Sequence, residues 1–217
     1  MPDPRSGPLL VAYYEAYLRD QDVDVFRLQV SSRYLEGTIT KLAGSADLRT
    51  RRAAVFALGL VGSFRSNTIV ARALRDHDAT IRGIAENALW AIWFRADTPE
   101  NNDALEQVSL LIGQHEYGRA VKSASQLIEQ APHFAEAYNQ RAIAEYHLGD
   151  FQASASDCRL VLERNAYHIG ALAGLAKCLL RLDRRGEALD TLRRSSRLQP
   201  FNDDLRHLIA VLEDNQR

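Results

Sequence analysis

Apolar residues recur at helical spacing along most of the chain, and two repeat lengths organise them. Between residues 101 and 217, a pattern of two helices joined by a short turn returns every 34 residues. The middle copy is the clearest: a helix over residues 136–148, a turn at Gly149 and Asp150, and a second helix over residues 151–164. Self-similarity at a fixed period is the signature of a solenoid, so the period itself predicts stacked helix pairs.

The N-terminal part predicts one helix and one segment that the pattern leaves open. After a flexible leader over residues 1–8, apolar residues at helical spacing predict a helix that ends near Asp20. Residues 23–30 alternate imperfectly between apolar and polar side chains. They could form a short strand or an extended segment packed on the helices, and a lone strand is the less stable option. We therefore expect a helix followed by an extended segment over residues 9–33.

A second repeat, 31 residues long, fills residues 34–96. Asp47 matches Asp78, Arg51 matches Arg82, and alanines and leucines follow at equal spacing. Each copy predicts a short helix, a turn bearing Asp, and a longer helix rich in Ala and Leu. The Asp suits the helix N-cap, where its carboxylate accepts from free backbone N–H groups. The Arg four residues later can reach the same turn.

Both repeats resemble known families. The copies at residues 34–96 resemble HEAT-like repeats in their Asp turns and their Arg, Ala and Leu positions. Residues 101–217 resemble the tetratricopeptide repeat (TPR) family at its turns, close-packing sites and helix stops, which are here Tyr117, Ala120, Pro132, Tyr138, Ala142, Gly149, Phe151, Val161, Leu172, Leu175, Ala176, Ala188 and Pro200. The resemblance implies an all-α fold, a right-handed α-α superhelix of HEAT-like helix pairs, three TPR units and a C-terminal capping helix.

Composition is that of an ordinary globular protein, with 46% hydrophobic and 25% charged residues. The net charge of −1 provides no electrostatic drive toward nucleic acid or an anionic membrane, so neither is an expected partner. No apolar run is long enough to span a bilayer, and we expect a cytoplasmic protein. Cys158 and Cys178 are too few for a disulfide framework and fall in apolar helical patterns, where they should pack as small hydrophobic side chains.

The chain lacks a convincing catalytic or cofactor motif. Its six histidines have no metal-binding helix spacing, its glycines do not form a phosphate-binding loop, and its serines have no His in a nucleophile pattern. We therefore expect no enzyme, no catalytic residue, no metal and no cofactor. Arginines gather between Arg181 and Arg197, but several lie in the last turns of a helix, where cations complement the helix dipole. We interpret this cluster as a solvated face.

The TPR resemblance implies a binding surface. In that family the first helix of each unit lines a concave groove that binds peptides or partner helices. Carried over by position, the expected groove combines two amides, an apolar footing and several cationic or imidazole side chains: Asn139, Gln140, Ile143, Tyr146, His147, Lys177, Arg181 and His207. Tyr146 and Arg181 are the first expected hot spots, because hot spots favour aromatic and Arg side chains.

One specific family function is not expected. Family members that bind chaperone tails hold a C-terminal carboxylate with a fixed set of Lys, Asn and Arg residues. The corresponding positions of this chain are Leu105, Ser109, Gln140, Gly170 and Gly174, which cannot form that clamp.

The leading hypothesis is therefore a non-catalytic scaffold or adaptor for a protein or peptide partner. HEAT-like repeats also occur in bilin lyases and their relatives, so residues 34–96 could instead hold a small ligand, an alternative that rests on fold alone. A third alternative is self-assembly through the tyrosine-rich first helix or through Trp90 and Trp93. These tryptophans could also form a ligand platform, although a seal between the two repeat arrays is the favoured interpretation. The partner and the oligomeric state stay open.

Overall fold

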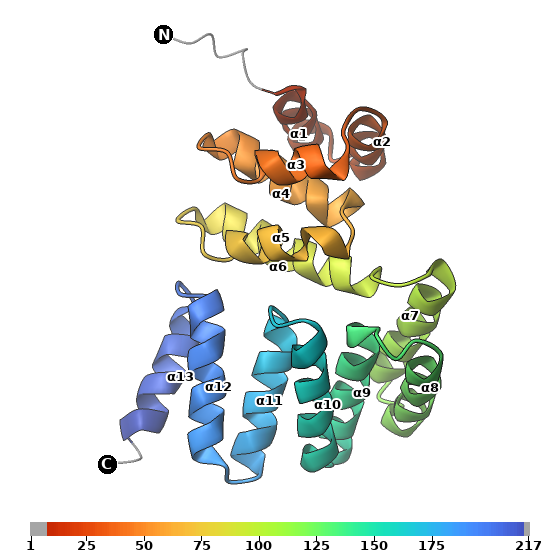
Figure 1. The fold of residues 1–217 in the computed structure, drawn as a ribbon, viewed down its shortest axis with the longest axis vertical. Coiled ribbons are helices and arrows are strands. Elements are labelled where there is room, and N and C mark those ends of the chain that lie inside the picture. The colour runs from red at the N-terminus through yellow and green to blue at the C-terminus, as the bar shows by residue number, and fades with distance from the viewer. Residues whose placement is uncertain (1–7, 215–217) are drawn as a thin grey trace. The chain divides into compact units, whose positions relative to one another are not determined.

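Helices form all the regular secondary structure of residues 8–214, which are the residues that the computed structural model describes (Figure 1). The predicted all-α class is thereby confirmed. The chain divides into two compact units, Met1–Trp93 and Phe94–Arg217, called here the first and the second unit. The predicted leader at residues 1–8 lies outside the described residues except for Pro8, and so do the last three residues of the predicted capping segment.

The first unit begins with two helices that pack on the long helix of the first 31-residue copy. Helices α1 and α2 both contact α4. In each 31-residue copy a short helix precedes a long one, α3 before α4 and α5 before α6 (Figure 1). The elements are α1 (Leu9–Asp20), α2 (Val23–Arg33), α3 (Glu36–Leu42), α4 (Leu48–Val61), the 3-10 helix η1 (Phe64–Ser66), α5 (Asn67–Ala73) and α6 (Ala79–Phe94). The predicted end of the first helix at Asp20 is confirmed.

The prediction of an extended segment or strand over residues 23–30 was wrong, because these residues belong to helix α2. Asp22 caps the helix by accepting a hydrogen bond from a backbone N–H of its first turn, at 3.0 Å. Phe26 and Val30 lie one turn apart and are both buried. Leu28, on another face of the helix, is apolar but exposed, and this second apolar face concealed the helical period.

The two 31-residue copies fold alike at their turns. The carboxylates of Asp47 and Asp78 accept from backbone N–H groups at the starts of α4 and α6, at 2.8 and 2.9 Å. Arg51 and Arg82 each donate through Nη1 to two carbonyl oxygens of the turn before their own helix. Arg51 also pairs with Asp76 in the second copy, at 2.9 Å. The predicted roles of Asp and Arg are confirmed, while the HEAT-like assignment of residues 34–96 stays a prediction.

The second unit consists of seven helices in residues 94–214, each packed against the next along the chain (Figure 1). They are α7 (Pro99–Gly113), α8 (Tyr117–Gln130), α9 (Ala135–Leu148), α10 (Phe151–Arg164), α11 (Ile169–Arg181), α12 (Arg185–Leu198) and α13 (Asp203–Asp214). The starts of α8, α10 and α12 are 34 residues apart, in register with the sequence repeat.

Residues 97–102 form the start of helix α7 inside the second unit. The Asp97 side chain is only 3% exposed and accepts from the side-chain amide of Asn101 at 2.7 Å. Its other oxygen lies 2.9 Å from Nε2 of His133, which belongs to the turn between α8 and α9. The segment therefore ties the first turn of α7 to the neighbouring repeat.

The turns inside the three helix pairs share one backbone conformation. His115, Gly149 and Asp183 follow one another at the repeat spacing and have φ values of 61°, 84° and 55°. Glycine adopts this left-handed conformation freely, whereas other residues are strained there. Two of the three turns tolerate a side chain because the packing of the flanking helices imposes the turn.

Small side chains let the helices of the middle pair approach closely. Ala142 is 2% exposed, and the hydroxyl of Ser154 on α10 donates to its carbonyl oxygen at 2.7 Å. The thiol of Cys178 on α11 in turn donates to Ser154 Oγ at 3.1 Å. Burial raises the pKa of Cys158 to about 12 and also raises that of Cys178. Both cysteines are buried thiols, which confirms their predicted packing function.

The turn geometry leads to a paired test. Replacing Asp183 by Gly should raise the free energy of unfolding by about 0.5–1 kcal/mol, because the strain of a side chain at positive φ is relieved. The exposed ion pair between Asp183 and Arg185 contributes little that would be lost. Gly149→Ala should lower stability by about 1–2 kcal/mol, since no neighbouring atom would clash and only φ is strained. Urea unfolding measures the free energy of unfolding of both variants. Changes of the same sign in the two variants would contradict a shared left-handed conformation at these turns.

Candidate functional site

The eight predicted groove residues divide into a buried pair and a group of half-buried or exposed residues. Asn139 and Gln140 form the buried pair, with 3% and 5% of their surface exposed. Their side-chain amides donate to the same oxygen of Glu136, at 2.7 and 2.8 Å. Because both amides are engaged with a buried carboxylate, the structure favours a structural function for them over contact with a peptide backbone.

Glu136 joins two consecutive repeats through a buried partner. Its second carboxylate oxygen lies 2.8 Å from His168 Nε2, and neither side chain is exposed to solvent. His168 caps α11 because its Nδ1 accepts from the backbone N–H of Ala171 at 3.0 Å. The proton therefore resides on Nε2, which donates to Glu136. The carboxylate thus receives donors from α9 itself and from the start of α11, as a buried charge requires.

Three of the half-buried or exposed residues meet at one end of the helix pairs. There, five rings and one guanidinium form a continuous series of contacts, which we call the aromatic ladder: His115, Tyr117, His147, Tyr146, Phe151 and Arg181. These residues come from the turn before α8, the starts of α8 and α10, and the ends of α9 and α11. The ladder therefore crosses all three helix pairs of the second unit.

The contacts of the ladder hold its side chains in defined positions. The ring of Tyr117 stacks on His147 with 4.6 Å between centroids and an interplanar angle of 5°. Tyr146 meets Phe151 edge-on at 5.3 Å, and the Arg181 guanidinium lies 4.3 Å from the centre of the Phe151 ring. Such aromatic and cation–π contacts each contribute about 0.5–1.5 kcal/mol. The His147 ring packs against Tyr117 and the Arg181 guanidinium against Phe151, yet both residues stay exposed.

The remaining predicted groove residues lie outside the ladder contacts. Ile143 is half-buried on α9, and Lys177 and His207 are exposed on α11 and α13. Lys177 pairs with none of the residues that the structure describes. The sequence had placed His115 and Tyr117 in a turn without a binding function. A 34-residue period shows which residues are equivalent, but not that side chains of successive copies stack on one another.

Glu145, a half-buried acid of α9, has a raised pKa. Arg141 binds Asp157 through two hydrogen bonds, of 2.6 and 2.9 Å. Glu145 lies farther from the same guanidinium, at 3.9 Å, and its Oε2 is buried without a hydrogen-bond partner in the described part of the chain. Burial, together with the charge of Asp157, raises the pKa of Glu145 to about 7.

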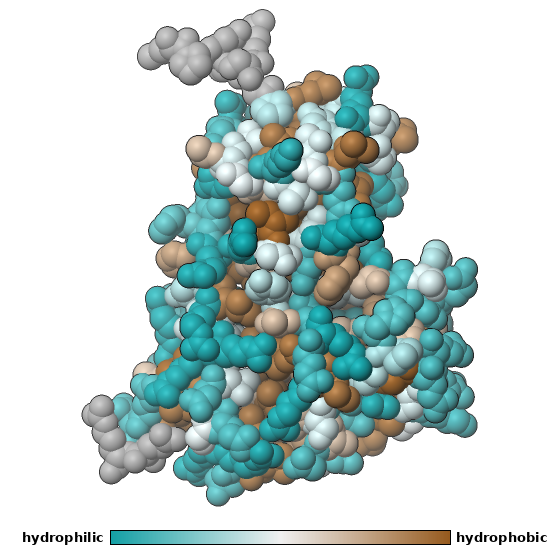
Figure 2. Space-filling view, in the orientation of Figure 1, coloured by the Kyte–Doolittle hydropathy of each residue, from teal (hydrophilic) through white to brown (hydrophobic). Residues whose placement is uncertain are grey.

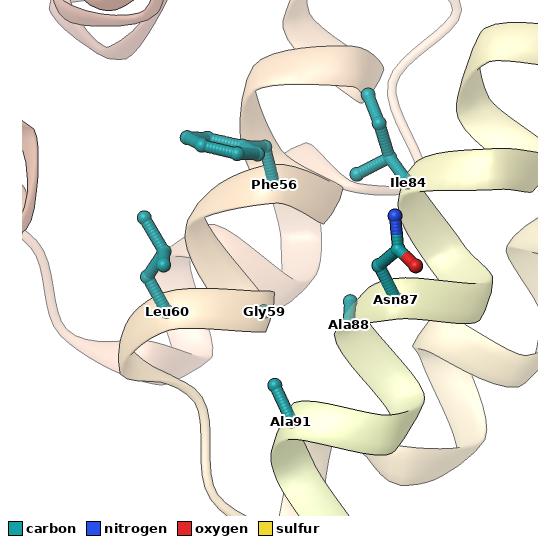
Figure 3. Close-up of a pocket in the computed structure, with 7 residues that line it drawn as sticks. All are labelled: Phe56, Gly59, Leu60, Ile84, Asn87, Ala88 and Ala91. Atoms are coloured by element: carbon teal, nitrogen blue, oxygen red, sulfur yellow. The ribbon is translucent and has the colours of Figure 1, made fainter. Parts of the chain in front are cut away.

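The first unit contains a separate cavity of about 240 Å³ between α4 and α6 (Figure 3). Seven residues line it: Phe56, Gly59, Leu60, Ile84, Asn87, Ala88 and Ala91. A Cβ atom at Gly59 would come within 2.9 Å of the Ala88 side chain, so the glycine permits the close approach of the two helices. Of these seven side chains, only that of Asn87 is polar. The cavity is thus suited to a small apolar group.

Trp93 is an interior residue of the first unit. It is 2% exposed, and its indole N–H donates to Oδ1 of Asn67 at 2.8 Å. Trp90 packs edge-on against it, with 5.1 Å between the ring centres. The alternative of an exposed platform formed by both tryptophans was therefore wrong, because burial and a hydrogen bond occupy Trp93.

The described residues form no metal site, and the basic cluster is paired with acids. Within residues 8–214, no three His, Cys, Asp or Glu side chains gather as a metal ion would require, and no helix has the length and apolar character to cross a membrane. Arginines of the basic cluster pair with acids: Arg184 with Glu187 at 2.6 Å, and Arg193 with Glu213 at 2.7 Å. These pairs agree with a solvated face.

Helix pairs that stack at a fixed sequence spacing define a helical-repeat protein. No protein-family model matches the chain. Over 115 residues it is 24% identical to a TPR repeat-containing protein of Rhizobium etli, a match that covers 53% of this chain and 56% of that protein. The chain thus spans about half the length of this curated relative. The name of the relative supports the predicted TPR resemblance, whereas the HEAT-like prediction has no counterpart among these matches.

Two solved structures match this chain in part. The TPR2B-domain:pHsp70 complex of yeast Sti1 matches with a TM-score of 0.49 and 22% identity, over 55% of this chain and all of that one. The TPR2AB-domain:pHSP90 complex of yeast Sti1 matches with a TM-score of 0.48 and 20% identity, over 94% of this chain and 88% of that one. At these identities the likeness concerns the fold alone.

Glu145 provides a pH-dependent prediction for the second unit. Its pKa is about 7 in the folded chain against 4.5 without the fold, so the folded state binds more protons between these values and stability falls as pH rises from about 4.5 to 7. Glu145→Gln removes this loss and should raise the free energy of unfolding at pH 8 by about 2 kcal/mol. At pH 4 the variant should match the parent protein.

Urea unfolding at both pH values measures this effect. Glu106→Gln, a matched change of an exposed acid on α7, should leave the difference between the two pH values unaltered. A Glu145→Gln protein that is less stable than the parent at pH 8 would show that the ionised carboxylate is favourable in the fold.

Proposed function

We propose that the second unit is a non-catalytic protein-interaction module that binds a peptide or a partner helix. The observation that carries this proposal is the aromatic ladder, in which Tyr146 and Arg181 converge on Phe151 while Arg181 stays exposed. Aromatic and Arg side chains dominate the binding energy of protein interfaces. Their fixed positions reduce the entropy that would be lost on binding.

The proposed surface extends from the ladder along α9, α11 and α13. Half-buried Ile143 offers an apolar contact, and Lys177 and His207 offer exposed donors. Asn139 and Gln140 are left out because their amides are engaged by Glu136. The partner differs from the Hsp70 and Hsp90 peptides named for the Sti1 complexes, since this chain lacks the residues of a carboxylate clamp.

The test compares capture by the parent protein with capture by Tyr146→Ala combined with Arg181→Ala. Proteins retained from a lysate of the native cell are quantified by mass spectrometry. At least one protein enriched by the parent should fall by about tenfold or more with the double variant, because two hot-spot side chains are removed. Circular dichroism should show unchanged helix content.

A matched control removes an exposed aromatic and an exposed arginine elsewhere, with Phe64→Ala combined with Arg197→Ala. This control should retain the same proteins as the parent. Equal capture by the parent and the ladder variant would exclude the ladder as the binding surface.

The cavity of the first unit favours a second candidate function, the binding of a small apolar ligand. Its volume of about 240 Å³ lies just below the range of about 300–1,000 Å³ typical of sites for drug-sized molecules. A compact apolar molecule or one large apolar side chain would fit. Asn87 would provide a single polar contact at the lining (Figure 3).

Filling the cavity tests this second function. Ala91→Phe should lower the fluorescence enhancement of an apolar naphthalene sulfonate dye by about twofold or more, because the ring occupies the space of the ligand. Ala12→Phe adds the same ring at an exposed site of α1 and should leave the signal unchanged. An equal signal from the Ala91→Phe protein and the parent would show that the cavity does not admit the dye.

A further inference from the structure

The short-helix side of the first unit bears exposed cations without ion-pair partners in the described part of the chain. Residues 37–75 contain seven basic residues but a single acid, Asp47, whose carboxylate caps α4. Three of the basic residues lie on α4 and pair with acids of other segments. The remaining four, which we call the basic stripe, are exposed and form no ion pair with any described residue: Lys41, Arg65, Arg72 and Arg75.

Three cations of the basic stripe lie on one face of a single helical segment. The 3-10 helix η1 continues directly into α5, and the backbone N–H of Arg75 extends the last turn by donating to the carbonyl oxygen of Arg72 at 3.0 Å. Arg65, Arg72 and Arg75 are seven and three residues apart, which places them within about a quarter of the helix circumference. Val70 and Leu74, on the opposite side, are 0% and 2% exposed. The three arginines therefore form the outer face of the segment.

Lys41 lies beside this face on the neighbouring helix α3. Lys41 and Arg72 occupy the same position in the two 31-residue copies. The copies are in contact here, because the Glu36 carboxylate accepts from the hydroxyl of Ser66, and Thr40 Oγ1 lies 3.5 Å from the same hydroxyl. The basic stripe thus extends over two adjacent helices.

The face of α3 around Lys41 is open to a partner. Gly37 and Gly44 lie four residues before and three residues after Lys41, on the same side of the helix, and neither has a side chain. A Cβ atom at Gly37 would meet open space. Figure 2 shows hydrophilic side chains that project from the face of the first unit where Figure 1 places α3 and α5. A partner can therefore approach the backbone of α3 and contact the cations of both helices.

The acids that flank the basic stripe in the sequence are already engaged. Glu36 accepts from the backbone N–H of Ser63 at 2.9 Å and from the hydroxyls of Ser63 and Ser66. Asp76 pairs with Arg51 at 2.9 Å. Four like charges without counter-charges repel one another, and a partner of negative charge relieves this repulsion.

The spacing of the arginines fits acidic side chains on a partner helix. A helix that lies along η1 and α5 has the same rise of about 1.5 Å per residue, so acids seven and three residues apart match the three arginines over about 15 Å. Arg guanidinium groups bind carboxylates through two parallel hydrogen bonds. Nucleic acid fits less well, because proteins that bind it commonly contact about 6–10 phosphates, whereas the stripe has four cations and the chain a net charge of −1.

We propose that the basic stripe of the first unit binds an acidic helix of a partner protein. This surface is independent of the aromatic ladder, which belongs to the second unit, and of the cavity, which residues of α4 and α6 line. The two proposed functions of those sites can fail without consequence for the basic stripe.

Fluorescence anisotropy of a labelled peptide, titrated with the full chain at low ionic strength, tests the proposal. The probe is an alanine-rich helical peptide whose four glutamates share one face at spacings of three and four residues. Arg72→Glu combined with Arg75→Glu should weaken binding by about tenfold or more, because like charges then face each other. Arg72→Gln combined with Arg75→Gln should weaken it by a smaller factor. Added salt should weaken binding to the parent, because it screens exposed charges.

A matched control reverses two exposed arginines that lie elsewhere and have no ion pair in the described residues, with Arg33→Glu combined with Arg197→Glu. The net charge of this control equals that of the Arg72→Glu and Arg75→Glu protein, yet it should bind the peptide within about twofold of the parent. Circular dichroism should show the helix content of the parent in every variant. A control that loses as much affinity as the stripe variant would assign the effect to net charge and overturn the proposal.

Three further outcomes overturn the proposal. The first is equal binding of the parent to a peptide of the same composition with its glutamates distributed around the helix. The second is tighter binding to a single-stranded RNA of similar length, which would identify nucleic acid as the partner. The third is self-association of the parent that the charge reversal abolishes, which would place acids of a second copy on the stripe. The Tyr146→Ala and Arg181→Ala protein should bind the peptide as the parent does, which separates this result from the test of the ladder.

Discussion

The buried carboxylate of Glu136 is the constraint on which the packing of the second unit depends. A charge without solvent contact must receive hydrogen bonds from every side, and here the donors are Asn139, Gln140 and His168. His168 comes from the next repeat and also caps α11, so one network sets the spacing of two helix pairs. Removal of one member would leave the others buried and unpaired, at a cost of about 3–5 kcal/mol.

This network also separates structural from exposed polar residues on the first helices of the repeats. The amides of Asn139 and Gln140 are engaged in the interior, so the proposed recognition relies on side chains farther along α9 and α11. There, Tyr146 and Arg181 are held against Phe151. The close packing of the interior and the defined positions of the ladder side chains thus have a common origin. Closely packed repeats fix the helices from which these side chains project.

Local signals predicted most of the elements because their causes are local. Asp47 and Asp78 cap the helices that begin directly after them, and Gly149 forms a turn through its own positive φ. Helix α2 escaped the sequence interpretation because Leu28 carries an apolar side chain on its exposed face. The burial of Gln140 was not predicted either, because the sequence does not show whether a buried acid accepts a hydrogen bond from an amide on a helix face.

By itself, the sequence determined the repeat lengths, the all-α class and the helix caps, since periodicity and capping act over a few turns of chain. Only the tertiary structure decided which polar residues are buried, that side chains of three repeats join in a ladder, and that α2 leaves apolar side chains exposed. The contacts of Glu136 with His168 and of Tyr117 with His147, for example, join residues about one repeat apart. Such contacts follow from the distances between packed helices, which no local pattern specifies.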